Sequence, residues 1–323
     1  MFKAAKVLVT GASGLIGCNL INRLLADGAQ VRAPLFRTPP VLRHPNIEYL
    51  TVDLRRAEDS ARAVQGMDYV FMCAANTSGA AAIAKSPLDH VTPNILMNTQ
   101  MLQAAWEARV RKFCFISSSV AYPPSGDRPV REEDMFTGDP PDVYFPAGWM
   151  KRSAEVLCRT YAEKIRPPMP CVVIRPSNIY GPYDKFRPET SHVTAALIRR
   201  VALRENPMVI WGTGNDVRDL IYVDDFIDGM LSVFQQVDDF AAVNIASGEG
   251  VTVRDILELL LDITGQRDVA VSYDTSKPQM LPIRLIDAGL ADRRFGFKAK
   301  TSLRDGLSLT LDWYRTHGAD HPR

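Results

Sequence analysis

The sequence predicts an α/β fold: a doubly wound parallel sheet with a smaller C-terminal α/β lobe. Two observations predict it. In the first half of the chain, short apolar runs alternate with segments whose apolar residues recur at the helical period, the pattern of βαβ units. After Arg175, proline and glycine become frequent and this regular order ends, which indicates a second lobe.

The predicted strands are apolar runs, and the predicted helices lie between and after them. The strands are Lys6–Thr10, Gln30–Leu35, Ile47–Val52, Tyr69–Cys73, Lys112–Ser117 and Cys171–Arg175. The helices are Leu15–Ala26, which Gly28 caps, Asp59–Gln65, Asn94–Ala108, Gly148–Lys164 and Val193–Leu203, the last followed by a strand, Met208–Trp211. We expect Asp219–Val223 and the helix after it to return to the main sheet.

Composition sets limits on partners and compartment. The 323 residues are 46% hydrophobic and carry a net charge of +1, so nothing general favours nucleic acid or a membrane surface. The five cysteines lie in apolar runs without CxxC spacing, so no metal site is expected. The chain enters its first strand with no signal-like stretch, and no apolar run reaches the ~18 residues of a membrane span. We therefore expect a reducing cytoplasm.

Three glycines spaced three apart begin directly after the first strand and continue into the first helix. Such glycines permit a tight turn, a close approach of backbone to a pyrophosphate, and close packing of helix on sheet, while the helix N-terminus offers amide donors. The turn therefore predicts a dinucleotide site. Its cofactor-binding positions are Gly11, Ser13, Gly14, Leu15, Ile16 and Gly17.

The ends of the next strands predict which dinucleotide binds. An acidic residue that accepts the ribose 2′-hydroxyl of NAD is expected after the second strand, but that place holds Leu35, and Arg37 follows. A guanidinium suits a 2′-phosphate, so Arg37, with Arg32 nearby, favours NADP over NAD. Asp53 and Leu54 are predicted to meet the adenine, and the small Ala74 and Ala75 to let the cofactor lie close.

Several motifs resemble the extended short-chain dehydrogenase/reductase family, which acts on nucleotide sugars, and they span nearly the whole chain. They are the glycine turn, Ile116-Ser117-Ser118-Ser119, Gly148-Trp149-Met150-Lys151 and Arg175-Pro176-Ser177-Asn178-Ile179-Tyr180-Gly181-Pro182. Resemblance to the GDP-L-fucose synthases within that family is most specific in Tyr183-Asp184-Lys185-Phe186, Ser191-His192-Val193, Trp211-Gly212-Thr213-Gly214, Arg218-Asp219 and Asp274-Thr275-Ser276-Lys277-Pro278.

The resemblance implies a catalytic set of a serine, a tyrosine and a lysine four residues after that tyrosine. Ser118 and Lys151 match the first and last, but the tyrosine position holds Ala147. Alanine cannot exchange a proton, and loss of such a group costs ~10²- to 10⁴-fold in rate. Three interpretations stay open: a substitution engineered to trap a ligand, a natural branch that uses another group, or a site that only binds. Tyr144 is close in sequence, but it lies seven residues before Lys151, beyond a proline.

Epimerisation next to a ketone needs a base on one face and a proton donor on the other. The resemblance implies that His192 is one of these groups, whereas Val120 occupies the place of the other, a cysteine. A narrower task than double epimerisation is therefore expected, such as single-centre epimerisation or 4-keto reduction.

The substrate site is predicted to hold a nucleotide diphosphate sugar. Asn178, Arg200, Arg218 and Arg284 form the expected diphosphate clamp, because guanidinium groups bind pyrophosphate at two points. Ser119, His192 and Trp211 complete the substrate set implied by the resemblance.

Together these features predict an NADP-dependent epimerase or 4-keto reductase of a (GDP-)4-keto-6-deoxy sugar. The alternatives are a nucleotide-sugar 4-epimerase or dehydratase, or a non-catalytic sensor of nucleotide sugar or NADP. We expect residues 1–180, with 218–247, to form a Rossmann domain and residues 181–217 and 248–323 to form the sugar-nucleotide lobe. The resemblance also implies a homodimer joined through Asn94–Ala108 and Gly148–Lys164.

Overall fold

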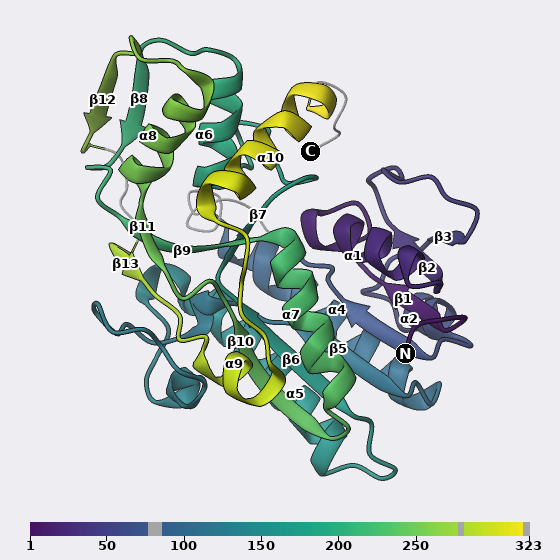
Figure 1. The fold of residues 1–323 in the computed structure, drawn as a ribbon. Coiled ribbons are helices and arrows are strands. Elements are labelled where there is room, and N and C mark those ends of the chain that lie inside the picture. The colour runs from purple at the N-terminus through teal and green to yellow at the C-terminus, as the bar shows by residue number, and fades with distance from the viewer. Residues whose placement is uncertain (77–85, 277–280, 319–323) are drawn as a thin grey trace.

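The protein consists of a large parallel sheet covered by helices on both faces and a smaller lobe beside it (Figure 1). The computed structural model describes residues 1–76, 86–276 and 281–318. The predicted fold class, a doubly wound sheet with a smaller C-terminal lobe, is confirmed.

The large sheet has seven strands, all parallel, in the order β10-β6-β5-β4-β1-β2-β3. The strands are β1 (Lys6–Val9), β2 (Gln30–Leu35), β3 (Ile47–Thr51), β4 (Tyr69–Met72), β5 (Lys112–Ile116), β6 (Cys171–Pro176) and β10 (Phe240–Ile245). The strand order reverses between β1 and β4. In open parallel sheets, ligands bind outside the carboxyl ends of the strands at this point.

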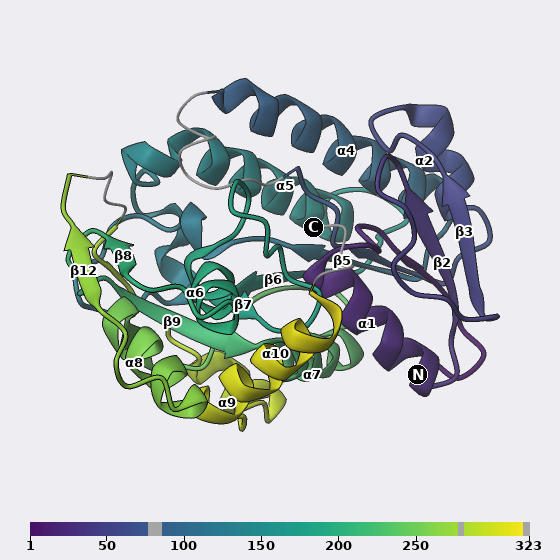
Figure 2. The same ribbon diagram turned by 90° about the horizontal axis from the view of Figure 1, so that it is seen from above.

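Side-chain alternation along β1 explains why helices cover both faces. Val7 and Val9 belong to one core and Leu8, which points the opposite way, belongs to a second. The first core is covered by α1 (Leu15–Ala26) and α7 (Val223–Gln236). The second is covered by α2 (Ala57–Val64), α4 (Pro87–Glu107) and α5 (Phe145–Glu163), as Figure 2 shows.

The smaller lobe contains two further sheets. In one, β9 (Val217–Tyr222) pairs with β7 (Asn178–Tyr180), β11 (Gly250–Thr252) and β13 (Ile283–Arg284), and in the other β8 (Met208–Trp211) pairs with β12 (Val271–Asp274). The helices here are α6 (Val193–Ala202), α8 (Val253–Thr264) and α10 (Leu303–His317), while α9 (Gly289–Phe295) packs against α7 and β10 of the large sheet.

One expectation about the chain path was right for the helix but wrong for the strand before it. The segment predicted as Asp219–Val223 forms most of β9, which lies in the smaller lobe, and the chain returns to the large sheet only through α7 and β10. Its strand pattern did not reveal its neighbours, because β9 pairs with segments far away in sequence.

Three helices begin earlier than predicted, and the first of them, α2, starts at Ala57 rather than Asp59. α4 starts at Pro87 rather than Asn94, because Pro93 is accommodated inside it, and α5 starts at Phe145 rather than Gly148. Short 3₁₀ turns, η1 (Ser119–Ala121), η2 (Glu132–Phe136) and η3 (Asp142–Tyr144), occupy the connection before α5. Among the described helices, none has the length and apolar character needed to cross a bilayer.

Candidate active site

The glycine turn lies at the carboxyl end of β1 and is built for close backbone contact. Gly11 has φ +68°, and a Cβ there would lie 2.8 Å from the Cys73 carbonyl oxygen and 2.9 Å from the Ala74 backbone. Gly14 is the N-cap of α1 and presents no side chain in front of the helix amides. The turn therefore forms a cradle that side chains would fill, and it fits a dinucleotide pyrophosphate.

The neighbouring segments close around this turn. The Ala74 amide donates to the Thr10 hydroxyl at 2.9 Å, which fixes the small residues after β4 beside the glycines. The Ser13 hydroxyl donates to the Pro39 carbonyl at 3.3 Å, so the segment after β2 lies against the phosphate turn. Ala75 follows at the same edge and is partly buried.

Two arginines flank one aromatic ring where β2 and β3 end. The guanidinium carbons of Arg37 and Arg55 lie 4.9 and 5.1 Å from the centre of the exposed Phe36 ring. Arg55 also binds Asp53 through both carboxylate oxygens, at 2.8 and 2.5 Å, and this hydrogen bonding lowers the pKa of Asp53. Leu54 is buried behind them. Sequence reasoning missed Arg55, whose position directly after the predicted Asp53-Leu54 pair was the available signal.

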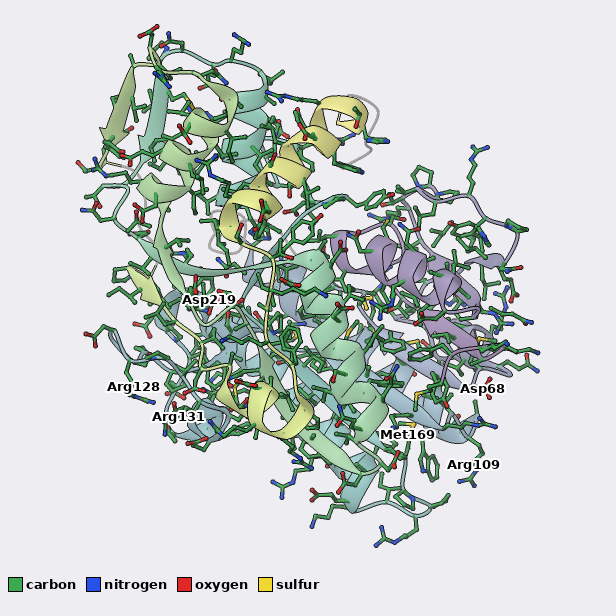
Figure 3. The ribbon with its side chains drawn as sticks, in the orientation of Figure 1. Asp68, Arg109, Arg128, Arg131, Met169 and Asp219 are labelled. Carbon is green, nitrogen blue, oxygen red and sulfur yellow. The ribbon has the colours of Figure 1, made fainter. Side chains whose placement is uncertain are left out.

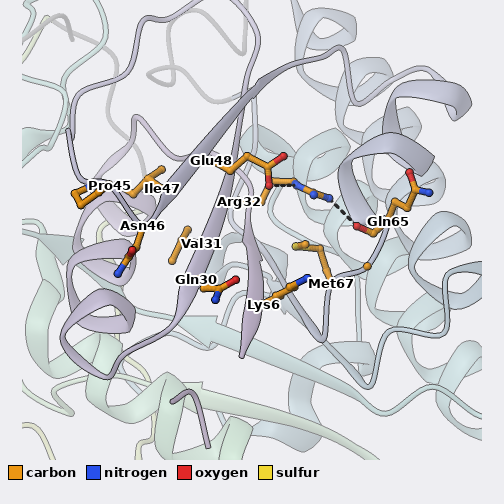
Figure 4. Close-up of a pocket in the computed structure, with 11 residues that line it drawn as sticks. Lys6, Gln30, Val31, Arg32, Pro45, Asn46, Ile47, Glu48, Gln65 and Met67 are labelled. Atoms are coloured by element: carbon orange, nitrogen blue, oxygen red, sulfur yellow. Dashed lines mark hydrogen bonds and ion pairs between the residues drawn. The ribbon is translucent and has the colours of Figure 1, made fainter. Parts of the chain in front are cut away.

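Arg32 does not belong to this group. Its guanidinium binds Glu48 at 2.9 Å and the carbonyls of Ala63 and Gln65 at 3.1 and 2.8 Å, at the end of α2. Figure 4 shows this arrangement in a hollow of about 420 Å³ lined by residues near the starts of β1, β2 and β3. The hollow is at the amino edge of the sheet, away from the glycine turn. The association of Arg32 with a 2′-phosphate is therefore wrong, because Arg32 caps a helix.

The catalytic positions implied by sequence come together at the carboxyl end of β5. Lys151 donates through Nζ to the Ile116 carbonyl at 2.8 Å, and Ser118 caps η1 by accepting from the Val120 amide at 3.3 Å. Burial lowers the pKa of Lys151 to about 8, although the charges of Glu155 and Cys73 act in the opposite direction. Ala147 precedes Lys151 by one helical turn on the same face of α5.

A buried polar network that sequence reasoning missed supports this edge. Glu155 accepts from the Ser117 hydroxyl at 2.5 Å and from Arg175 at 2.6 Å, and all three side chains are buried. Arg175 also donates to the Tyr122 hydroxyl at 3.0 Å. The network ties α5 to the ends of β5 and β6. Glu155 lies four residues after Lys151, a spacing that could have revealed it.

His192 lies in the smaller lobe as the N-cap of α6. Its side chain keeps contact with solvent, yet burial lowers the pKa of its imidazole and the charge of Lys185 lowers it further. The imidazole therefore holds a proton less readily than an ordinary histidine.

Arg218 and Arg284 form a pair of cations. They are register partners on β9 and β13, so their side chains leave the same face of the sheet. Arg218 binds Asp216 at 3.1 Å, but Nη1 of Arg284 is buried with no hydrogen-bond partner among the described residues. Burial lowers the pKa of Arg284 to about 10; the Tyr144 ring, 5.0 Å below its guanidinium, opposes this shift and Arg218 adds to it. An anion between the two arginines would satisfy both.

The other predicted substrate positions are more dispersed. Arg200 binds Glu205 at 2.6 Å and the Val209 carbonyl at 3.0 Å, contacts that fasten the end of α6 rather than extend toward Arg284. Trp211 is 63% exposed at the end of β8. Asn178 begins β7 and is partly buried, and Ser119 is buried in η1. Lys277 and Pro278 of the last family motif lie outside the described residues.

Asp219, the second residue of the Arg218-Asp219 motif, has a structural role. Its buried carboxylate accepts from the Ser247 amide at 3.1 Å, the Ser247 hydroxyl at 2.8 Å and the Gly248 amide at 3.0 Å. It lies where the smaller lobe meets the large sheet (Figure 3). Its role is to hold the loop after β10 against β9. Among the described residues, no group of three or more His, Cys, Asp or Glu side chains is arranged to hold a metal ion.

Comparison with known proteins identifies the family. Residues 7–246 match the model of the NAD dependent epimerase/dehydratase family. GDP-L-fucose synthase 1 of Arabidopsis thaliana is 32% identical over 97% of this chain and 94% of its own length, and GDP-L-fucose synthase of Escherichia coli is 27% identical over 96% of each. Among solved structures, UDP-glucose 4-epimerase of Thermotoga maritima, crystallised with UDP-glucose, has a TM-score of 0.84 at 26% identity. The match covers 96% of this chain and 99% of the epimerase chain. The chain belongs to the NAD-dependent epimerase/dehydratase family of enzymes.

Proposed function

We propose that this protein is an NADP-dependent 4-keto reductase or epimerase of a nucleotide diphosphate sugar, and that a GDP-4-keto-6-deoxy sugar is its preferred substrate. The observation that carries the proposal is the Arg218 and Arg284 pair, in which a buried guanidinium nitrogen lacks a partner among the described residues. A diphosphate supplies the paired oxygens that two guanidinium groups bind. The similarity to GDP-L-fucose synthases supports the choice of base.

The residues of the proposed reaction divide into two groups. The glycine turn with Ala74 holds the cofactor, whose nicotinamide exchanges hydride with the sugar carbon when bound. Ser118 hydrogen-bonds the sugar oxygen at that carbon, and Lys151 lies beside it at the end of β5. His192, whose pKa burial lowers, can carry one of the two proton transfers of an epimerisation, and Val120 supplies no group for the other.

We base the preference for NADP on Arg37 and Arg55, since two guanidinium groups suit a 2′-phosphate better than a hydroxyl. Arg37→Ala is expected to weaken NADP binding at least ~10-fold, the loss of one charge-assisted contact, while changing NAD binding little. The matched control is Arg32→Ala, which removes a helix cap and should lower the melting temperature without altering the NADP to NAD ratio. Equal loss of both cofactors in Arg37→Ala would contradict the assignment.

We also propose that residues 181–217 and 248–323 hold the sugar nucleotide, and that two copies associate through α4 and α5. Support for the homodimer comes from Ile95, Leu96 and Val156, which leave 40, 42 and 52% of their surface exposed on those helices. Val156→Asp should convert the dimer to a monomer in light scattering. A cytoplasmic location fits the five cysteines, all of them free thiols.

The test of the main proposal is turnover with purified 4-keto-6-deoxy sugar nucleotides. NADPH consumption, followed by absorbance with GDP-, UDP- and dTDP-linked substrates, should be fastest with the GDP-linked sugar. Consumption of NADPH separates a reductase from an epimerase or dehydratase that regenerates its cofactor.

Ala147 favours a second candidate, a protein that binds nucleotide sugar and NADP without catalysis. Ala147→Tyr separates the two. If neither the protein with Ala147 nor this variant turns over any substrate, although both bind NADP and GDP-sugar in calorimetry, the binding function is supported and the enzyme proposal is wrong.

A further inference from the structure

The first turn of α5 is pressed against the turn that carries Ser118. A Cβ on Gly148 would lie 2.5 Å from Cβ of Pro140 and 3.2 Å from the Val120 carbonyl oxygen, so the helix backbone is close to both. Ala147 precedes this contact and ends in a methyl group. The face of α5 between Ser118 and Lys151 therefore carries no side chain long enough to separate them.

Lys151 extends along this face to the carboxyl end of β5. Its Nζ binds the Ile116 carbonyl at 2.8 Å and lies 4.9 Å from the centre of the Phe115 ring. Ser118 follows Ile116 by two residues. The ammonium and the serine hydroxyl thus belong to the same strand end, where the reacting oxygen of a substrate is expected.

The other proton-carrying groups around this point are committed elsewhere. Glu155, from the same helix, accepts from Ser117 and Arg175. Cys73, directly after β4, has its pKa raised to about 12 by burial. Tyr144 lies ahead of α5 with its ring beneath the Arg284 guanidinium. Lys151 combines a position at the end of β5 with a pKa that burial lowers, so it gives up its proton more readily than an ordinary lysine.

We infer that Lys151 is itself the proton donor in the reduction, in place of the tyrosine that Ala147 replaces. The inference rests on the proposed 4-keto reduction. In the step, hydride from the reduced nicotinamide forms the new C–H bond at the carbonyl carbon, and the carbonyl π electrons move to oxygen. That oxygen takes a proton from Lys151 Nζ, which leaves the sugar as an alcohol, the nicotinamide oxidised and the lysine as a neutral amine that water reprotonates.

The electrostatic surroundings suit this role. Burial lowers the pKa of Lys151 to about 8, and Glu155 from α5 and Cys73, directly after β4, restrain that shift. An acid with a pKa near the working pH gives up its proton more readily than an ordinary lysine and is still mostly protonated at pH 7.

The test compares Lys151→Arg in the natural protein and in the Ala147→Tyr variant. Arginine keeps the positive charge but does not release a proton near pH 8. We expect kcat/KM for the GDP-4-keto-6-deoxy sugar to fall at least ~10²-fold in the natural background and less than ~10-fold in the Ala147→Tyr background, because the introduced phenol then donates the proton. Lys164→Arg, at the exposed end of α5, is the matched control. It should leave kcat/KM unchanged in both backgrounds.

Two further measurements do not depend on the loss of turnover. The ¹⁵N signal of Lys151 Nζ, assigned by its absence in Lys151→Arg, should titrate near pH 8 in the cofactor-free protein. The dissociation constant of Lys151→Arg for NADP should change less than ~10-fold, because arginine retains the charge. The pH profile of the natural enzyme should decline above pH 8, whereas the Ala147→Tyr profile should extend to higher pH.

Each contrary result has a distinct meaning. Equal losses from Lys151→Arg in both backgrounds, or a Nζ that titrates no lower than the ordinary lysine value of 10.5, overturn the role of Lys151 and leave the proposed reaction intact. Turnover by Ala147→Tyr but none by the protein with Ala147 also overturns the role of Lys151 and leaves the proposed reaction intact. Absence of turnover in both, with NADP still bound, overturns the proposed reaction and this inference with it.

Discussion

At the scale of single residues, the site contains charges that destabilise the ligand-free protein. Lys151 and Arg284 are both cations whose pKa burial lowers, to about 8 and about 10. A lowered pKa of a base means that the folded protein disfavours the charged form. Such residues contribute more to function than to stability.

Lys151→Met is expected to stabilise the cofactor-free protein near neutral pH. The folded pKa of about 8 lies below the ordinary 10.5, so the unfolded chain binds more protons between these values and the stability of the natural protein rises across this window. The advantage of the variant, about 1–3 kcal/mol at pH 7 from the size of the shift, should therefore shrink as pH approaches 10. Urea unfolding at pH 7 and pH 10 measures it, and an advantage independent of pH would show that packing, rather than charge, is responsible.

At the scale of elements, the turn between β1 and α1 depends on backbone shape. Gly11 combines φ +68° with close contact to the chain after β4, so a side chain there meets both strain and a clash. Gly126 has a similar φ of +64° but open space around it. The two glycines therefore separate the cost of strain from the cost of contact.

Gly11→Ala is expected to lower the free energy of unfolding by more than Gly126→Ala, which should cost ~1 kcal/mol from strain alone. Only Gly11→Ala should abolish NADP binding, because the turn must move away from the residues after β4. Thermal unfolding and calorimetry with NADP give the two readouts. Retention of NADP binding by Gly11→Ala would argue against the turn as the pyrophosphate cradle.

At the scale of the whole molecule, the proposed site draws its residues from both the large sheet and the smaller lobe. Lys151 and Ser118 come from the edge of the sheet, whereas Arg218, Arg284 and His192 come from the lobe. The Tyr144 ring beneath Arg284 joins the start of α5 to β13. A nucleotide sugar bound by Arg218 and Arg284 would therefore connect the two parts.

Arg284→Met is expected to raise the melting temperature of the ligand-free protein, because a methionine of similar length replaces a partly buried cation whose buried Nη1 lacks a partner among the described residues. The gain should be ~1 kcal/mol or more. GDP should raise the melting temperature of the natural protein but not of this variant. Thermal shift assays with and without GDP measure both effects, and equal stabilisation by GDP in the two proteins would exclude Arg284 from the phosphate site.

The sequence by itself determined the class of fold, the main sheet strands and the glycine turn. These features are local: apolar period, glycine spacing and the order of elements are properties of short segments. Six of the strands in the large sheet were predicted, with β2 correct at both ends, and α1 was predicted residue for residue. The family motifs likewise indicated Ser118, Lys151 and the family itself.

Only the tertiary structure decided which charged residues share a site. Arg32, Arg37 and Arg55 are alike in sequence, yet one caps a helix and two flank Phe36. Arg200 and Arg284 were both predicted to hold phosphate, yet one binds Glu205 and the other has a buried nitrogen without a partner among the described residues. The tertiary structure also decided that β9 pairs in the smaller lobe rather than in the large sheet. The physical reason is that a long side chain binds whatever the fold brings within reach, and those partners come from segments distant along the chain.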